Sequence, residues 1–369
     1  MVRFLHTADW QIGRQYGQFD PEDAAMLAEA RLAAVEAIAA QAAQERVDAV
    51  LVAGDVFDMQ EVSDRTVRRL FGALSAYAGP WVMIAGNHDA ALSASVWTRA
   101  QQLGCVPHNV HLPAATGVVD LPDAGLAVLA APLTQRHTYD DVTAAFDALA
   151  SEPGRVRVGL AHGSVSGHLP DTIDSANPIA ADRAARAQLD YLALGDWHGC
   201  LQIDARTWYA GTPEPDRFRA NAPGQMLLVQ IDGPGATPDV TPRAVGRYRW
   251  HAVEARIHLP GDADALVHQL AGLGADDVVQ LKLSGEVNGG THAQVMTAVG
   301  ETQGRVRALR LDARALELVP DDSDVAAFGS SGYLADVAAE LRARQDDPAQ
   351  ATAAREALRL LVGFAREGA

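Results

Sequence analysis

The sequence predicts an α/β fold, with a layered domain whose sheets are flanked by helices, then a small α+β domain and a C-terminal helical tail. Three observations predict it. Short apolar runs alternate with helical patterns early in the chain, and each run stops at a cluster of polar residues. A second series of strand and helix patterns, without such clusters, follows a Pro- and Gly-punctuated connection at residues 233–246. Two further helical patterns come last. Strands that alternate with helices form layered α/β domains.

The strands of the first domain share one pattern, an apolar run that ends at polar residues. They are predicted at residues 2–5, 48–53, 80–85, 157–161 and 191–194, with helices at residues 21–46 and 64–77 between the first three. The polar clusters that follow them are His6-Thr7-Ala8-Asp9, Gly54-Asp55, Gly86-Asn87-His88-Asp89, His162-Gly163 and Gly195-Asp196-Trp197-His198. In layered α/β domains, ligands bind beyond the carboxyl ends of strands. We therefore expect these clusters to form one site.

The patterns predict three parts along the chain. The first domain is expected at residues 1–245 and a small domain at residues 246–320, followed by a helical segment at residues 321–369. The small domain is predicted as a β-α-β-α-β unit, with strands at 250–258, 278–284 and 305–312 and helices at 263–273 and 291–300. The last segment is predicted as two amphipathic helices, at 333–344 and 348–366.

Composition limits the function classes. Of 369 residues, 48% are hydrophobic, and acidic residues give a net charge of −17. Such a charge argues against a protein that coats nucleic acid with a basic surface, although it permits an enzyme that holds phosphate through metal ions. There are only two cysteines, and neither a secretory leader pattern nor a run of eighteen apolar residues occurs. We expect a soluble cytoplasmic protein without membrane contact.

The residue types at the strand ends suit a two-metal centre. Two neighbouring cations can clamp phosphate oxygens and activate a water for in-line displacement. Such a centre requires a bridging carboxylate surrounded by imidazole, carboxylate and amide ligands. Any one cluster is weak evidence, because Gly-Asp after a strand is common in turns. Their succession along one chain is what favours a metal centre.

Five segments resemble the motifs of the calcineurin-like metallophosphoesterase superfamily, in its usual order and over about the first 200 residues. They are HTADWQIG, VLVAGDVFD, VMIAGNHD, LAHG and LALGDWHG. The opening motif, the GDVFD form, the small domain and the helical tail most resemble the DNA-repair nuclease branch, typified by SbcD and YhaO. The resemblance implies a metallophosphoesterase β-sandwich flanked by helices, with the small domain as a capping domain.

The resemblance also implies the metal ligands. Asp55 would bridge two divalent ions, Asp9 and His198 would bind the first, and Asn87 and His162 would bind the second.

Two positions depart from the superfamily pattern. Gln11 stands where the first motif has histidine, and it can offer only a carbonyl oxygen. Asp196 stands where the last motif has histidine, and it would complete the second ion's ligands. Because two imidazoles are replaced by oxygen donors, we expect harder ions, Mn²⁺ above all, in preference to Zn²⁺.

The remaining assignments concern catalysis and substrate. The resemblance implies that His88 is the general acid that protonates the leaving oxygen, and that Asp58 orients it by hydrogen bonding. Asp89 is interpreted as structural support, and His6 as a core or supporting histidine outside the ligand set. Residues beside the motifs are expected to contact substrate through stacking or phosphate binding: Trp10, Arg14, Tyr16, Trp197 and Arg217.

The leading hypothesis is a Mn²⁺-dependent DNA phosphodiesterase, exonuclease or endonuclease, that acts in DNA repair as a homodimer. In the resembled branch the helical tail docks onto an SbcC-like coiled-coil ATPase, which would be the partner. One alternative is a phosphodiesterase or phosphatase for small molecules such as cyclic nucleotides. A second alternative, motivated by Gln11 and Asp196, is a degenerate nuclease that serves as a structural subunit.

Overall fold

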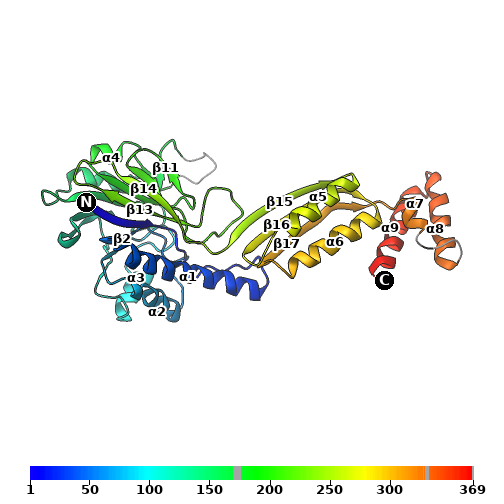
Figure 1. Cartoon of the computed structure of the whole chain (residues 1–369), viewed down its shortest axis with the longest axis horizontal. Coiled ribbons are helices and arrows are strands. Elements are labelled where there is room, and N and C mark those ends of the chain that lie inside the picture. The colour runs from blue at the N-terminus through cyan, green and yellow to red at the C-terminus, as the bar shows by residue number, and fades with distance from the viewer. Residues whose placement is uncertain (169–175, 327, 329–331, 368–369) are drawn as a thin grey trace. The chain divides into compact units, whose positions relative to one another are not determined.

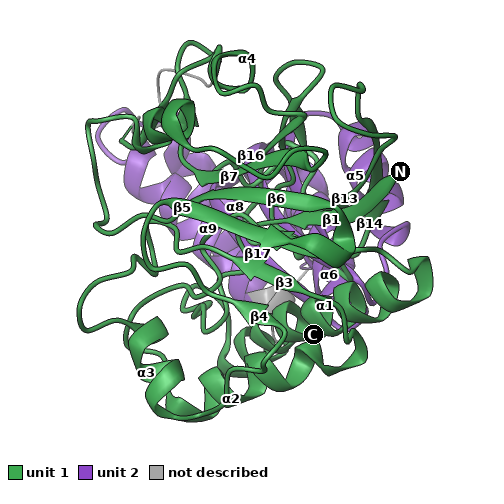
Figure 2. Ribbon diagram, turned by 90° about the vertical axis from the view of Figure 1, so that its left-hand side faces the viewer, with its two compact units in different colours: residues 1–248 green, residues 249–369 purple. Residues whose placement is uncertain are grey.

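The computed structural model describes residues 1–168, 176–326, 328 and 332–367. They belong to two compact units, residues 1–248 and residues 249–369 (Figure 2). The first unit contains all the strand-end clusters, and the second contains the expected β-α-β-α-β arrangement.

The first sheet of unit 1 has the strand order β14-β13-β1-β2-β3-β4. Three of its strands, β14, β13 and β2, are labelled in Figure 1. Its parallel strands are β1 (Val2–Thr7), β2 (Ala49–Val52), β3 (Trp81–Met83) and β4 (Val110–His111). The helix α1 (Pro21–Glu45) joins β1 to β2. The helix α2 (Asp64–Ala73) and the short 3₁₀ helix η1 (Leu74–Ala76) join β2 to β3, and α3 (Val96–Gln102) joins β3 to β4. The antiparallel strands β13 (Gln225–Ile231) and β14 (Asp239–Ala244) complete the other edge. In register, Phe4 lies opposite Ala49 and Thr7 opposite Val52, so β1 and β2 end at the same edge.

The second sheet of unit 1 has the order β11-β12-β10-β7-β6-β5. The strands β6 (Leu126–Ala131), β7 (Val156–His162), β10 (Tyr191–Gly195) and β12 (Thr207–Tyr209) are parallel, whereas β5 (Gly117–Leu121) and β11 (Leu201–Gln202) are antiparallel edge strands. Short elements fill the connections: η2 (Pro122–Ala124), η3 (Val142–Ala148), β8 (Ser164–Val165), β9 (Pro178–Ile179) and α4 (Arg183–Arg186).

The two sheets share a core. Phe4 and Leu51 of the first sheet belong to the same buried cluster as Val128 and Leu160 of the second. Alternate residues of the first sheet, such as Val50, face the other way and pack with α1, α2 and α3. Because the central strands are buried on both faces, they are continuous apolar runs, which explains why the sequence reveals them. The predicted sandwich flanked by helices is confirmed.

Unit 2 begins with a three-stranded parallel sheet, β15 (Arg249–Ile257), β16 (Asp277–Val287) and β17 (Ala308–Leu318), joined by α5 (Pro260–Ala271) and α6 (Gly289–Gln303). Leu266 of α5 and Val295 of α6 pack against Val253 and Leu281 of the sheet. The helical segment comprises α7 (Asp322–Ala326), α8 (Tyr333–Ala343), the turn η4 (Arg344–Asp346) and α9 (Ala351–Glu367). None of the helices in the described part of the chain has the length and apolar character needed to cross a membrane.

Candidate metal centre

The site forms where the central strands of both sheets end. The loop after β1 carries Asp9, the loop after β2 carries Asp55, and β7 ends at His162 itself. The ligand atoms of these three buried residues all lie within 4.8 Å of one another. The structure therefore brings His162 close to two carboxylates that precede it by more than a hundred positions in the sequence.

His162 presents a single ring nitrogen to the cluster. Its Nδ1 lies 2.8 Å from the main-chain oxygen of Ala53. A carbonyl oxygen can only accept, so Nδ1 carries the hydrogen and Nε2 is the ligand nitrogen. That Nε2 lies 3.5 Å from Asp55 Oδ1 and 3.3 Å from Asn87 Oδ1. The Oδ1 atom of Asp196 lies 3.7 Å away. Side-chain oxygens and one imidazole nitrogen thus face one another, and these atoms are suitable ligands for a divalent cation.

The charges of the cluster also fit a cation. Burial, with a contribution from Asp55, raises the pKa of Asp9 to about 6 against the opposing effect of His198 and His162. Burial also raises the pKa of Asp196. Burial alone would lower the pKa of His162, but the neighbouring carboxylates outweigh it and raise that pKa to about 9. Burial, reinforced by the charge of Asp55, therefore makes Asp9 and Asp196 bind protons more tightly than usual, and a bound cation would compete with those protons.

Glycines allow the close approach of the ligand loops. A Cβ atom at Gly86 would collide with the Asp55 carboxylate, and one at Gly54 would collide with the His162 ring. A Cβ at Gly195 would collide with the main-chain oxygen of Ala53. These glycines immediately precede or adjoin the ligand positions, so the motif glycines are required by packing around the ligands.

The ligand loops contain unusual backbone conformations. Asp9, Gln11, Asp55 and Asp196 have φ angles of 55°, 45°, 52° and 99°, in the left-handed region that non-glycine residues rarely adopt. Hydrogen bonds hold two of them, from Asp9 N to the Gly54 oxygen at 3.0 Å and from Gln11 N to the Asp55 oxygen at 2.9 Å. Strained residues of this kind cluster at functional sites.

His88 lies at the edge of the cluster, with its side chain 30% exposed. Its main-chain N donates to Asp55 Oδ1 at 2.9 Å, and its Nε2 lies 4.0 Å from Asp55 Oδ2. We expected Asp58 to orient this histidine, and the atom that does so is the main-chain oxygen of Asp58, 2.8 Å from Nδ1. The Asp58 carboxylate instead accepts from Arg14 at 3.2 Å.

Asp89 is a buried residue that holds the loops after β2 and β3 by hydrogen bonds. Its carboxylate accepts from the main-chain N of Gly86 at 2.7 Å and from that of Phe57 at 3.1 Å. Burial, followed by the charge of Asp55, raises the pKa of Asp89 to about 7. The side chain thus ties the loop after β2 to the loop after β3.

His198 lies beside Gln11. The Nε2 of Gln11 is 3.2 Å from His198 Nε2, while the Oε1 of Gln11 accepts from Arg14 Nη1 at 2.7 Å. The carbonyl oxygen through which Gln11 was expected to bind a metal is thus occupied by Arg14. The structure brings Gln11 to the site but turns its oxygen away from His198.

Two of the expected substrate contacts are wrong. Trp10 and Tyr16 are each only 1% exposed. Trp10 packs edge-on against Trp81 and donates to Thr7 Oγ1 at 2.9 Å, and the Tyr16 hydroxyl accepts from Arg31 at 3.2 Å. Buried in this way, Trp10 cannot stack on a substrate base, and Tyr16 cannot reach a backbone phosphate.

The other three expected contacts reach the surface. The side chains of Arg14 and Arg217 are 24% and 43% exposed. Trp197 is half-buried, and the guanidinium of Arg219 lies 5.8 Å from its ring centroid. These residues remain candidates for substrate binding.

Sequence reasoning missed two buried residues that support the ligand loops. Arg31 of α1 donates to the main-chain oxygens of Trp10 at 2.6 Å and Asp9 at 2.9 Å. Asp216 Oδ2 lies 3.1 Å from His198 Nδ1. Burial alone would raise the pKa of Asp216, but His198, Arg31 and Arg217 hold it well below its usual range. A signal for Arg31 exists, since an arginine on the apolar face of a helix requires buried partners.

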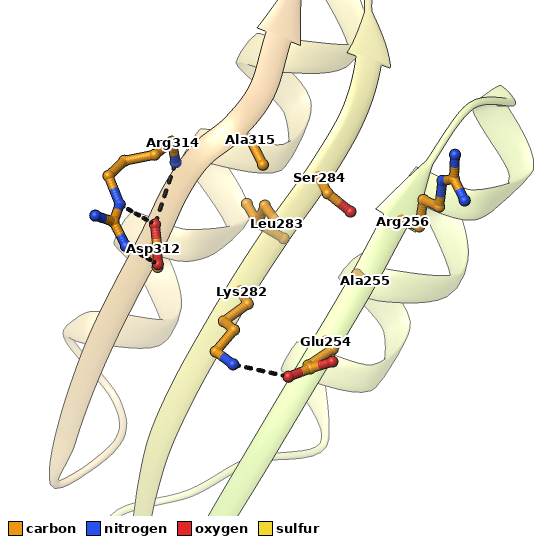
Figure 3. A pocket seen from close by; sticks show the side chains of 9 residues that line it. All are labelled: Glu254, Ala255, Arg256, Lys282, Leu283, Ser284, Asp312, Arg314 and Ala315. Carbon is orange, nitrogen blue, oxygen red and sulfur yellow. Dashed lines mark hydrogen bonds and ion pairs between the residues drawn. The ribbon is translucent and has the colours of Figure 1, made fainter.

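Unit 2 has a surface hollow whose lining residues differ from those of the metal centre (Figure 3). It lies on the three-stranded sheet, and none of the nine described residues that line it is a histidine. Its Lys282 pairs with Glu254 at 2.9 Å, and its Arg314 pairs with Asp312 at 2.7 Å. No group of possible metal ligands lies among its described lining residues, so we assign no catalytic role to the hollow.

A buried cluster of carboxylates and imidazoles, at the strand ends of a two-sheet sandwich, defines a metal-dependent phosphoesterase. The sequence matches the model of the calcineurin-like phosphoesterase family over residues 2–200. The chain belongs to this family, whose members use divalent metal ions.

Two relatives are named as nuclease subunits, and a third is named as a DNA repair protein. The chain is 42% identical over 97 residues to the SbcD subunit of the nuclease SbcCD from Rhodobacter capsulatus, covering 24% of this chain and 22% of that protein. It is 28% identical over 273 residues to the corresponding SbcD protein of Bacillus subtilis, covering 63% and 67%. It is 27% identical over 251 residues to the DNA double-strand break repair protein Mre11 of Aeropyrum pernix, covering 63% and 59%. The chain thus spans between about a fifth and two thirds of these relatives.

Proposed function

We propose that this protein is a two-metal phosphodiesterase that hydrolyses DNA phosphodiester bonds in DNA repair. The observation that carries the proposal is the cluster of Asp9, Asp55 and His162, with His88 at its edge. The names of the relatives, a nuclease component and a double-strand break repair protein, support DNA as the substrate.

The residues divide between two metal positions that share Asp55. Position 1 is formed by Asp9, Asp55 and His198, and position 2 by Asp55, Asn87, His162 and Asp196. The prevalence of oxygen donors favours Mn²⁺. When bound, the two ions supply Lewis acidity that stabilises phosphate charge and lowers the pKa of water.

His88 is suited to protonate the leaving oxygen. Its Nδ1–H is fixed by the Asp58 carbonyl, so the nitrogen that faces Asp55 is Nε2. The acid form is the imidazolium, which would donate from Nε2, the nitrogen 4.0 Å from Asp55 Oδ2. With 30% of its side chain exposed, His88 remains accessible to a substrate.

The surface beside the site supplies groups that suit a polynucleotide. Arg14 and Arg217 offer cations for backbone phosphates, and Trp197 offers a partly exposed ring for a base. These contacts are local, so they are compatible with the net charge of −17.

We further propose a homodimer with a coiled-coil ATPase as partner, acting in the cytoplasm. The support is an exposed apolar set on α8 and α9, in which Tyr333 is 80%, Phe364 68% and Leu334 46% exposed. Large apolar side chains that are exposed on paired helices are candidates for contacts with a partner. The unpaired cysteines fit a reducing compartment.

A cleavage assay tests the substrate. Purified protein with Mn²⁺ is offered single-stranded DNA, duplex DNA, a cyclic nucleotide and an aryl phosphodiester. We expect DNA cleavage by the wild type and its loss in Asp55→Asn and His88→Ala. Asp48→Asn is the matched control, because Asp48 lies at the opposite end of β2 and binds Arg3 N at 2.8 Å.

Other outcomes support other functions. Hydrolysis of the small substrates alone supports a small-molecule phosphodiesterase, which the acidic net charge favours. If the wild type and Asp55→Asn are equally inert with every metal, the protein is a structural component of a larger complex. Capture of a coiled-coil ATPase by the wild type, lost when Tyr333 and Phe364 are both replaced by Ser, tests the partner separately.

A further inference from the structure

Asp216 is a buried carboxylate that neither the sequence motifs nor the family match accounts for. It follows the last matched residue by sixteen positions, since the match ends at residue 200. Its relative exposure is only 2%. A carboxylate this deeply buried requires partners, and its partners all belong to the metal centre or its surface.

The first partner is the metal ligand His198. Asp216 Oδ2 lies 3.1 Å from His198 Nδ1. Arg217 Nη2 is also near that nitrogen, at 2.9 Å, but it can donate to Asp216 Oδ2 at 3.1 Å instead. An ionised carboxylate can only accept, and the Gln11 amide nitrogen, 3.2 Å from His198 Nε2, can only donate. The assignment that satisfies both places the hydrogen on Nδ1. The lone pair is then on Nε2, the nitrogen that faces Gln11.

The other partners are the two cations beside the site. Arg217 Nε lies 3.0 Å from Asp216 Oδ1, and Arg14 Nη2 lies 3.5 Å from Asp216 Oδ2. The same carboxylate therefore contacts a ligand of metal position 1 and both arginines expected to bind phosphate. A carboxylate needed only for folding would not have to contact all three.

We propose that Asp216 is a positioning residue, which fixes His198 with its Nε2 lone pair toward metal position 1 and holds Arg14 and Arg217 beside it. This role rests on the proposed two-metal function. Histidines that bind metals commonly donate their other ring N–H to a carboxylate, and loss of that partner costs about 10- to 100-fold in metal affinity or activity.

The substitution Asp216→Asn tests the role at nearly constant size. Its amide can donate to Nδ1, and this favours the tautomer with the hydrogen on Nε2, the effect known when the buried aspartate of a serine protease triad is replaced by asparagine. Asp190→Asn is the matched control. Asp190 is also a buried aspartate, but it precedes β10 and accepts from the main-chain N of Arg157 and Gly235.

Calorimetric titration with Mn²⁺ measures the effect without any activity assay. We expect two ions in the wild type, and in Asp216→Asn a loss of about 10- to 100-fold in affinity at one position only. Asp190→Asn should keep both affinities. If Asp216→Asn binds both ions as the wild type does, the positioning role is wrong while the two-metal centre stands. If the wild type binds no Mn²⁺, the proposed function fails and this role with it.

Nuclear magnetic resonance provides a second test that does not depend on the variant folding. In metal-free wild type labelled with ¹⁵N-histidine, the His198 signals, identified by their absence in His198→Gln, should show the Nδ1–H tautomer. In Asp216→Asn they should shift toward the Nε2–H tautomer. An Nε2–H tautomer in the wild type would overturn the proposal even if Asp216→Asn fails to fold.

Discussion

Nδ1 of His88 donates to the main-chain carbonyl of Asp58 at 2.8 Å, and the Asp58 carboxylate turns instead to Arg14. The orienting acceptor is thus part of the backbone and is retained whichever side chain stands at position 58. Its position depends on the fold of the loop, because Asp58 N in turn donates to the Ile12 oxygen at 3.1 Å.

Substitution of His88 should therefore slow hydrolysis more than substitution of Asp58. We expect His88→Ala to lower kcat by about 10²- to 10⁴-fold, the usual contribution of general acid catalysis. Asp58→Asn should lower it by less than about tenfold, since only the contact with Arg14 is weakened. Single-turnover rates with saturating DNA measure both. Equal losses in the two variants would show that the carboxylate itself orients His88.

The lack of an imidazole at position 11 should set the metal preference, since the Gln11 oxygen itself accepts from Arg14. In Gln11→His an imidazole replaces the amide beside His198, so we expect Zn²⁺ affinity to rise by more than about tenfold relative to Mn²⁺. Competition between the two ions, followed by calorimetry, measures the ratio. Gln11→Glu is the control, because it supplies another oxygen and should keep the preference for Mn²⁺. An unchanged ratio in Gln11→His would mean that position 11 does not reach the metals.

The parts of the fold that the sequence predicts are those with a local signal. Strands such as β2 and β10 are apolar runs that end at polar clusters, and their ends meet in the structure. The strand β6 has a similar apolar run but ends at Ala131 without a polar cluster, and it was not predicted. The pairing of β13 with β1 joins residues more than two hundred positions apart, and no local pattern encodes it.

The residues of the site also divide into those that a local sequence pattern predicts and those that it does not. Asp9, Asp55 and His162 follow from their places at strand ends. Asp216 follows no predicted strand, so its contact with His198 depends on tertiary structure alone. Trp10 was misjudged because it lies between Asp9 and Gln11, whose left-handed backbone conformations are not visible in the sequence. Neighbours of a ligand in sequence are therefore poor guides to substrate contact.

Asp89 should make the stability of the metal-free protein depend on pH. Burial and the charge of Asp55 raise its pKa from 3.8 to about 7. The folded state then binds this proton more tightly than the unfolded state, so its contribution is complete below the unfolded pKa and is lost as pH rises through about 7. Asp9, whose pKa is raised to about 6, should likewise make the folded state less stable as pH rises.

Melting temperatures of metal-free wild type and Asp89→Asn, compared from about pH 5 to about pH 8, measure this effect. Asn cannot accept from both Gly86 and Phe57, so the variant should be less stable at low pH by about 1–3 kcal/mol. The difference should shrink as pH rises, because only the wild type loses the contribution of the bound proton. Parallel curves would show that Asp89 is ionised throughout this range.

Arg31 should be the most costly support of the ligand loops to remove. It is only 1% exposed and donates to the main-chain oxygens of Asp9, Trp10 and Glu214. Arg31→Leu leaves the Trp10 oxygen without its donor, and the single Thr212 hydroxyl hydrogen can serve only one of the Asp9 and Glu214 oxygens, which lie 2.8 Å and 2.9 Å from Thr212 Oγ1. We therefore expect a loss of about 3–5 kcal/mol in the free energy of unfolding, measured in urea. Arg69→Leu is the control, because Arg69 forms an exposed ion pair with Glu29 that contributes about 1 kcal/mol or less.

Mn²⁺ affinity separates the role of Arg31 in the metal centre from its role in stability. The guanidinium holds the Asp9 carbonyl at 2.9 Å, next to the left-handed backbone that presents the Asp9 carboxylate. Without this contact the strained loop can relax, so folded Arg31→Leu should bind Mn²⁺ more weakly than Arg69→Leu does. If Arg31→Leu is destabilised but binds Mn²⁺ with wild-type affinity, the other contacts are sufficient to hold the loop, among them the hydrogen bonds from Asp9 N to Gly54 O and from Thr212 Oγ1 to Asp9 O.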